Sequence, residues 1–408
     1  MKYKIDSLNC LADIQTGPFG SQLHNEDYVL EGTPIVTVEH LGEKNFKKQN
    51  LPFVSDADKE RLSKYVLKTG DIVFSRVGSV DRCSYVSAKY DGWLFSGRCL
   101  RVRPNETLDP QYLYYYFCAE ETKQFVRNIA VGATMPSINT ALLGQVQISY
   151  PDIITQKKIA AILSALDEKI AINRAINENL ERQISEIYKS WYQDYSCVEG
   201  VPLVETDYGR IPKGWHYSIL GDLCKSVSVT HKFDVEKLVF LNTGDVEDGR
   251  FLHSNYMAVS DMPGQAKKTI APDDILYSEI RPINKHYAYV TFPSEDYVVS
   301  TKLMVIRASG IDSRRLYHYL TTEDVITKLQ MEAESRSGTF PQIRFDNISK
   351  LPILIADDVT EAAFTTLLRT VYDQIEHNNS ENKKLALLRD SLLPRLMSGE
   401  IDVSAVQL

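Results

Sequence analysis

Two long stretches of the chain carry the same pattern, with seam positions spaced alternately four and three residues apart. The first stretch begins at Thr155 and the second begins at Thr360, 205 residues later. Apolar residues at this spacing lie on one face of a helix and form the seam along which two helices pair. Each stretch therefore predicts a helix of about 40 residues, which is ~60 Å long at ~1.5 Å per residue.

Two asparagines interrupt the seam at matching places in both stretches. They are Asn173 and Asn177 in the first stretch, and Asn378 and Asn382 in the second. A polar residue in a seam lowers stability, but it also penalises slipped registers in which it would meet hydrocarbon without a partner. The pattern predicts two helices paired antiparallel in one register. The alternative is that the asparagines face solvent at a frayed or kinked point.

The repeat continues into the segments before each helix. The strand pattern GDIVFS at 70–75 recurs as DDILYS at 273–278, and GATMPSI at 132–138 recurs as SGTFPQI at 337–343. Alternating apolar positions bounded by turn residues predict short strands. We therefore expect an α+β fold with two strand-rich globular domains, each followed by a long helix. The expected boundaries are 1–154 for the first domain, 155–196 for its helix, 197–355 for the second domain with a linker at 197–214, and 356–408 for the second helix and tail.

Composition excludes several classes of protein. No apolar run is long enough to span a membrane, and no signal peptide precedes the first domain, so we expect a cytoplasmic protein. The six cysteines and eight histidines form no metal-binding pattern, and no metal site is expected. The net charge of −8 argues against a strongly basic surface. Half of this charge lies in 355–408, however, so each domain could still hold a local basic face.

Four motifs in this order resemble the specificity subunit of type I restriction–modification enzymes. They are TGPFGSQL at 16–23, LDEKIAINRAINENLERQISEIYKSWY at 166–192, IPKGW at 211–215 and LLPRLMSGEI at 392–401. The resemblance implies that each strand-rich domain is a target recognition domain for one half of an asymmetric, interrupted DNA sequence. It also implies that the two helices set the spacing and bind two modification (methyltransferase) subunits, which restriction (translocase and nuclease) subunits then join.

The resemblance further implies that this chain has no catalytic site and binds no cofactor. S-adenosylmethionine, and ATP with Mg, would belong to the partner subunits. The residues agree independently, because the sequence contains no GxxxxGK[ST] phosphate loop, no NPPY-type methylation motif and no GxSxG nucleophile elbow.

Candidate DNA contacts lie in turns that the repeat places at matched positions. Base recognition uses polar side chains, and phosphate binding uses cations and small residues. The turn after 70–75 and its counterpart after 273–278 supply Ser75, Arg76, Ser79 and Arg82, and Ser278, Arg281, Asn284, Lys285 and His286. Matched positions with different chemistry are expected of two domains that recognise different half-sites. The alternative is that both turns are ordinary solvated loops.

Further candidates are less specific. Gly17, Gly20, Ser21 and Gln22 could present backbone N–H groups to a phosphate, although a tight structural turn is an equal alternative. Arg98, matched by Lys302, is expected on one strand with Arg101 and Arg103, where a solvated sheet face is the alternative. A second repeated turn before each helix supplies Thr134, Ser137, Thr339, Gln342 and Arg344, and could be wholly structural.

Two functions from different classes follow from these patterns. The first is a DNA specificity subunit, whose partners are double-stranded DNA and the modification and restriction subunits. The second is a protein–protein scaffold that uses the paired helices and protein-binding domains. A basic face on each domain would favour the first.

Overall fold

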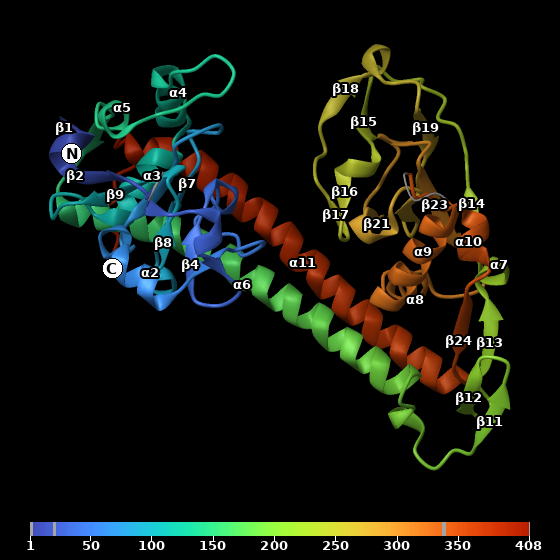
Figure 1. Cartoon of the computed structure of the whole chain (residues 1–408). Coiled ribbons are helices and arrows are strands. Elements are labelled where there is room, and N and C mark those ends of the chain that lie inside the picture. The colour runs from blue at the N-terminus through green and yellow to red at the C-terminus, as the bar shows by residue number, and fades with distance from the viewer. Residues whose placement is uncertain (1–2, 19–21, 337–339, 408) are drawn as a thin grey trace. The chain divides into compact units, whose positions relative to one another are not determined.

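The computed structural model describes residues 3–18, 22–336 and 340–407. The chain forms two compact units (Figure 1), of which unit 1 comprises Met1–Ala175 with Asn378–Leu408, and unit 2 comprises Ile176–His377. The long helices α6 (Ile153–Tyr192) and α11 (Asp358–Met397) each contribute one segment to each unit.

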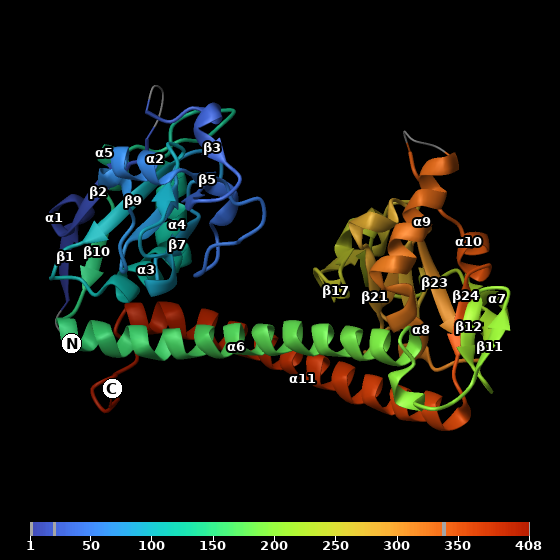
Figure 2. The same cartoon turned by 60° about the horizontal axis from the view of Figure 1, so that its bottom comes forward.

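Two four-stranded sheets form the strand-rich domain of unit 1. One is antiparallel with strand order β2-β9-β6-β7, and the other has the order β3-β5-β4-β8 with β4 and β8 parallel. A separate antiparallel pair, β1 with β10, leads into α6 (Figure 2). The strands are β1 (Lys4–Ser7), β2 (Ala12–Thr16), β3 (Tyr28–Val29), β4 (Thr33–Val36), β5 (Phe53–Val54), β6 (Ile72–Ser75), β7 (Cys83–Tyr85), β8 (Leu94–Phe95), β9 (Cys99–Pro104) and β10 (Gln147–Tyr150).

A single apolar core joins the first of these sheets to the helices of unit 1. The aromatic helix α3 contributes Tyr112 and Phe117 to this core, and the helix pair contributes Leu163 of α6 and Leu396 of α11. Asp109 starts α3 because its carboxylate accepts the backbone N–H groups of the first turn. The shorter helices are α1 (Leu8–Leu11), α2 (Asp56–Arg61), α3 (Pro110–Cys118), α4 (Glu120–Ile129) and α5 (Thr140–Leu143).

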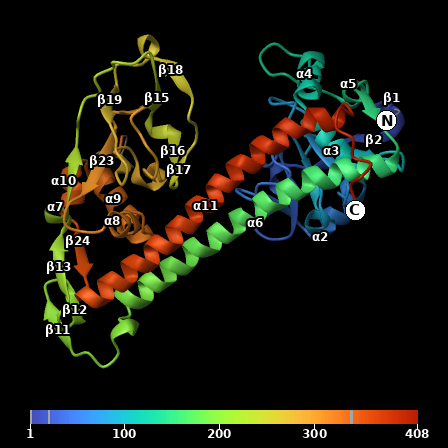
Figure 3. The ribbon, with the colours of Figure 1, turned by 180° about the vertical axis from the view of Figure 1, so that it is seen from behind.

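Unit 2 repeats the topology of the first sheet and the parallel pair of the second, but the fourth strand of its second sheet lies at the opposite edge. Its antiparallel sheet has the order β14-β23-β20-β21, and its second sheet has the order β18-β15-β22-β19 with β15 and β22 parallel. The pair β13 with β24 leads into α11 (Figure 3). The strands are β13 (His216–Ile219), β14 (Cys224–Val227), β15 (Lys237–Leu241), β16 (Val246–Glu247), β17 (Arg250–Phe251), β18 (Tyr256–Ala258), β19 (Ala266–Thr269), β20 (Ile275–Ser278), β21 (Tyr287–Tyr289), β22 (Tyr297–Ser300), β23 (Leu303–Ala308) and β24 (Pro352–Ile355).

The helices of unit 2 occupy the matching places. They are α7 (Leu220–Leu223), α8 (Ser313–Leu320), α9 (Glu323–Arg336) and α10 (Phe345–Ser349). The segment 197–214, expected as a linker, contains a β-hairpin of β11 (Leu203–Thr206) and β12 (Gly209–Pro212). Its apolar residue Ile211 is buried beside Trp215 and the helix residue Tyr192, and this burial orders the segment.

The two long helices pack antiparallel within each unit, which confirms the predicted fold class. In unit 1, Ile159 and Leu163 of α6 share a core with Leu396 near the end of α11. In unit 2, Ile184 near the end of α6 shares a core with Phe364 near the start of α11. Every seam position is buried or half-buried, although Ala160, Ser164 and Tyr192, which lie outside the seam, are buried as well.

The seam asparagines lie between the helices rather than in solvent. Asn173, Asn177 and Asn378 are at most 7% exposed, and Asn382 is half-buried. The side-chain amide of Asn173 donates to Glu381 at 2.7 Å and to Asn382 at 3.0 Å. The solvent-facing alternative is therefore wrong for the three buried asparagines, while their control of the register stays a prediction.

Candidate nucleic-acid interface

Three loops of unit 1 meet at one edge of the sheet β2-β9-β6-β7. They are the β6–β7 turn, the turn before β9 and the loop before α5. The backbone N–H of Arg76 donates to the carbonyl of Arg98 at 2.8 Å, and the N–H of Gly78 donates to the carbonyl of Pro136 at 2.8 Å. The N–H of Ile138 returns to the carbonyl of Arg76 at 2.9 Å. These bonds bring together the candidates Arg76, Ser79, Arg82, Arg98, Thr134 and Ser137.

The side chains of these loops give unit 1 a local basic face. Arg82 and Arg98 are exposed, and the half-buried Arg76 donates one guanidinium N–H to the carbonyl of Gly97 at 3.1 Å. The acid in the same turn, Asp81, is paired with Arg127 at 2.5 Å. Cations gathered on neighbouring loops suit the phosphates of a nucleic acid.

The same three loops meet in unit 2 through matched hydrogen bonds. The backbone N–H of Glu279 donates to the carbonyl of Lys302 at 3.0 Å, and that of Arg281 donates to the carbonyl of Pro341 at 3.2 Å. The N–H of Ile343 returns to the carbonyl of Glu279 at 2.8 Å. The repeat seen in the sequence is therefore reproduced in the backbone hydrogen bonds. The candidates that these loops carry in unit 2 are Arg281, Asn284, Lys285, Lys302, Gln342 and Arg344.

The charges at the matched positions differ. Glu279 stands where unit 1 has Arg76, and its carboxylate pairs with Lys302 at 3.3 Å. Lys285 pairs with Glu323, a contact that raises the pKa of the lysine. Arg281 is exposed. Two cations of unit 2 are therefore held in ion pairs, and the same backbone frame carries a different set of donors and acceptors.

Several candidates serve the fold instead. Ser75 and Ser278 are buried, and their hydroxyls donate to the carbonyls of Val77 at 2.8 Å and Ile280 at 3.2 Å. His286 donates from Nδ1 to the carbonyl of Val246 at 2.8 Å. These three side chains brace the turns rather than extending from them.

Other candidates have partly structural roles. The hydroxyl of Ser137 donates to the carbonyl of Val131 at 3.2 Å. The exposed Arg344 is the N-cap of α10, and its backbone N–H donates to the side chain of Asn347 at 2.8 Å. Ser79, Thr134 and Asn284 are exposed, and Gln342 is half-buried. The side chains of these four are uncharged polar groups that are accessible to a ligand in whole or in part, beside the exposed arginines of the two surfaces.

Gly17, one of the residues that could present a backbone N–H to a phosphate, uses its N–H within the fold. The N–H of Gly17 donates to the carbonyl of Cys99 at 3.2 Å, and a Cβ at this position would lie 2.1 Å from the carbonyl oxygen of Ser96. Glycine is required there because two backbone segments touch, and the N–H of Gly17 itself is not available to an anion. Gln22 is tied to the domain, since its side-chain oxygen accepts from the hydroxyl of Tyr65 at 2.6 Å. Gly20, Ser21 and Thr339 lie outside the described residues.

The three arginines expected on one strand have separate roles. Arg98 lies in the turn before β9 and is exposed, whereas Arg101 is only 3% exposed and forms an ion pair with Asp13. Arg103 pairs with the buried Asp71 at 2.6 Å. The expectation of a solvated sheet face is therefore wrong for Arg101. Its partner lies on the neighbouring strand β2, 88 residues away, and no local pattern reveals it.

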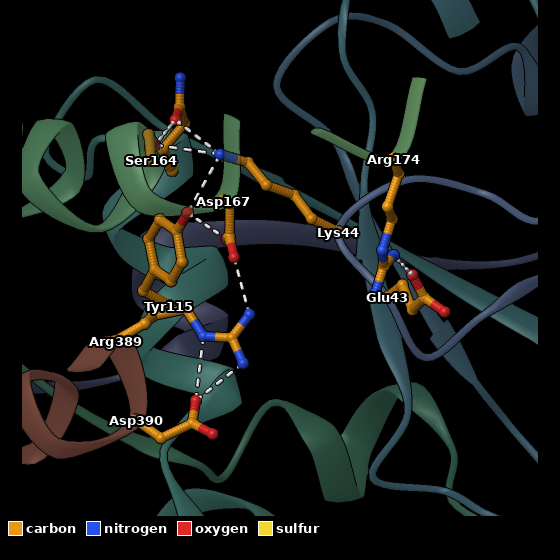
Figure 4. Close-up of polar contacts among 9 residues, drawn as sticks. Glu43, Lys44, Tyr115, Ser164, Asp167, Arg174, Arg389 and Asp390 are labelled. Carbon is orange, nitrogen blue, oxygen red and sulfur yellow. Dashed lines mark hydrogen bonds and ion pairs between the residues drawn. The ribbon is translucent and has the colours of Figure 1, made fainter. Parts of the chain in front are cut away.

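A polar network that the sequence analysis missed joins the domain of unit 1 to its helices (Figure 4). Lys44 donates to the hydroxyl of Tyr115 at 3.0 Å and to that of Ser164 at 3.0 Å. Tyr115 donates to Asp167 of α6 at 2.6 Å, and Arg389 of α11 donates to the same carboxylate at 2.7 Å. Burial lowers the pKa of Lys44. The sequence contained one indication of this network, because the charged Arg389 occupies a seam position that is otherwise apolar.

The described part of the chain shows neither a membrane-spanning helix nor a metal site. None of its helices has the length and the apolar character that a membrane span requires. Within the same residues, His, Cys, Asp and Glu side chains do not gather in groups of three that could hold a metal ion.

Comparison with known proteins places both units in one family. A family model described as the type I restriction modification DNA specificity domain matches twice, over residues 6–182 and 212–387. The specificity subunit of the type I restriction enzyme HindI from Haemophilus influenzae is 41% identical over 181 residues, an alignment that covers 44% of this chain and 39% of that subunit. The MjaIX specificity subunit of Methanocaldococcus jannaschii is 26% identical over 314 residues, with 74% of this chain and 71% of that subunit covered.

A solved structure shares the fold. The S subunit of a type I restriction–modification system from M. genitalium matches with a TM-score of 0.59 at 14% identity, and the match covers 97% of this chain and 96% of that one.

Proposed function

The chain belongs to the family of type I restriction–modification DNA specificity subunits, and we propose that its domains, residues 1–154 and 197–355, each recognise one half of a bipartite DNA target. The observation that carries the proposal is the matched set of three loops in both units. Identical backbone hydrogen bonds present Arg76 in one unit and Glu279 in the other. A shared frame with different side chains is suited to two half-sites of different sequence.

We propose that the helical segments, 155–196 and 356–408, set the gap between the half-sites. Forty residues span ~60 Å, comparable with about 18 base pairs at ~3.4 Å per step. The buried asparagines support a single register, because a slipped register would leave the amide of Asn173 without Glu381 and Asn382.

The outer faces of the helices support binding of two copies of one partner. Ile154 is 62% exposed in the first turn of α6, and Val359 is 79% exposed in the first turn of α11. These positions are 205 residues apart and equivalent in the repeat. Recurring apolar exposure suits two identical modification subunits, which would carry S-adenosylmethionine and the methyl-transfer chemistry. Restriction subunits, with ATP and Mg, would join that assembly.

Exchange of one domain tests the proposal. Methylation-sensitive sequencing of the host genome gives the modified motif, and replacing residues 1–154 by the corresponding domain of another specificity subunit should change one half of that motif. The complex with modification subunits should also bind its target with an affinity that falls steeply with salt. A change in both halves, or in neither, contradicts the proposal.

A further inference from the structure

A large apolar side chain is exposed at the same loop position in both units. Met135 is 64% exposed and Phe340 is 53% exposed, and 205 residues separate them. A single exposed apolar residue is ordinary on a protein surface. Its recurrence at one place in two domains of different sequence indicates that the exposed side chain has a function.

The loop of unit 1 presents Met135 on a rigid base. Val131 and Ser137 exchange backbone hydrogen bonds of 2.9 and 2.8 Å and so close the loop. Gly132 has a φ of +106°, and a Cβ there would lie 2.6 Å from the carbonyl oxygen of Met135, so the turn requires glycine. The carbonyl of Pro136 is held by Gly78 at 2.8 Å. A tip ordered in this way loses little entropy on binding.

Each tip belongs to a loop that is hydrogen-bonded to a turn carrying candidate cations of the interface. In unit 1 the loop is bonded through Ile138 to Arg76, whose own N–H bonds to the carbonyl of Arg98. In unit 2 Phe340 precedes Pro341, whose carbonyl accepts from Arg281. An apolar tip on a loop joined to cation-bearing turns suits a polyanion with an apolar interior, and stacked base pairs between two phosphate chains have this chemistry.

We propose that Met135 and Phe340 are apolar wedges that enter the base stack, one in each half of the DNA target. The proposal rests on the function proposed above and deepens it. Side chains inserted between base pairs unstack them and kink the duplex, and this is least costly at flexible pyrimidine–purine steps. Each half-site should therefore contain one such step, recognised by its deformability rather than by hydrogen bonds.

The test uses the full chain in complex with its modification subunits and a duplex of the sequenced target. 2-Aminopurine replaces single bases in each half, away from the base that is modified. The wild-type complex should raise fluorescence at one step in each half. Met135→Ser should remove the signal in one half only and weaken binding on the order of tenfold, and Phe340→Ser should do the same in the other half. Neither substitution should change the salt dependence, because no phosphate contact is lost.

Matched controls separate insertion from a general loss of apolar surface. Met135→Leu keeps an apolar tip and should retain both the fluorescence signal and the affinity. Leu30→Ser and Val235→Ser remove side chains that are 96% and 44% exposed and lie beside the other sheet of each domain, and they should leave binding unchanged. Thermal unfolding of each variant confirms that the fold is intact.

The outcomes distinguish the two proposals. If the wild-type complex shows no salt-sensitive binding to the target, the proposed function fails. If it binds but Met135→Ser and Phe340→Ser keep wild-type affinity and fluorescence, the wedges are refuted. Loss of the modification subunits from either variant would also refute them, because it would make the tip a protein contact.

Discussion

Replacing the buried Arg315 should strongly destabilise unit 2, although the matched position of unit 1 holds neutral groups. Arg315 is fully buried on α8, donates to Glu361 at 2.9 Å and to the carbonyl of Leu354 at 3.2 Å, and lies 4.3 Å from the ring of Tyr192. In unit 1 the carbonyl of Ser149, which corresponds to that of Leu354, accepts from the hydroxyl of Tyr112 at 2.8 Å. Gln156 stands at the position that corresponds to Glu361. At this position one unit joins its domain to its helices with an ion pair, and the other unit does so with neutral groups.

The magnitude follows from what each substitution leaves behind. Arg315→Met leaves a carboxylate that is 18% exposed and still accepts from Tyr192 at 2.7 Å and from the backbone N–H of Ala356 at 3.2 Å. Breaking a buried ion pair from one side costs about 3–5 kcal/mol, and these remaining contacts favour the lower value, about 3 kcal/mol. Glu361→Gln leaves a fully buried cation, which keeps the carbonyl of Leu354 as an acceptor, and should cost about 3 kcal/mol. The double variant has no unpaired charge, so it should be at least about 2 kcal/mol more stable than additivity predicts.

Urea unfolding followed by tryptophan fluorescence measures this coupling. Trp191 and Trp215 both lie in the core of unit 2 beside Tyr192, so a Trp93→Phe background restricts the signal to that unit. All four proteins must give the same dependence of free energy on urea for the comparison to hold. If the two single effects add within about 0.5 kcal/mol, the charge argument is refuted and the loss is due to packing.

Three further predictions test separate parts of the molecule. Burial, reinforced by nearby Arg315, lowers the pKa of His318 from 6.5 to about 3. As the pH falls, the unfolded state therefore binds a proton before the folded state does. The free energy of unfolding of unit 2 should fall by up to about 1.4 kcal/mol per pH unit below about pH 6.5. Urea unfolding of His318→Phe should show that this pH dependence is removed. Gly17→Ala places a Cβ against the backbone of Ser96 and should cost about 3 kcal/mol by thermal unfolding, whereas Gly244→Ala, with open space around it, should cost less than about 1 kcal/mol. Arg98→Ala should reduce the slope of log affinity against log salt by about 0.9 in anisotropy titrations, and an unchanged slope would show that this guanidinium binds no phosphate.

Helical periodicity was predictable because a helix is built from contacts within one turn of chain. The four-and-three spacing marked Ile159, Leu163 and Leu396, and all three are buried in the helix pair. The same pattern showed that a charged residue, Arg389, occupies a seam position, but it did not show what neutralises that charge. Asp167, which neutralises it, lies on the other helix and 222 residues away.

The candidate interface was only partly predictable. The repeat indicated which turns correspond, and backbone hydrogen bonds join those turns in both units. Local residue types could not distinguish Ser75, which is buried and braces a turn, from Ser79, which is exposed. Whether a hydroxyl faces the core depends on strands that are distant in the sequence.

The sequence by itself determined the duplication, the two long helices, the polar interruption of their seam and the family resemblance, because these are patterns of local spacing and of self-similarity. Only the tertiary structure decided which side chains of the turns are accessible, since accessibility depends on residues brought together from separate strands. In the folded protein Arg101 forms an ion pair with Asp13, Gly17 lies where two backbone segments touch, and Met135 is exposed at the tip of a loop. Their residue types alone did not distinguish these roles, because each role is set by neighbours that only folding supplies.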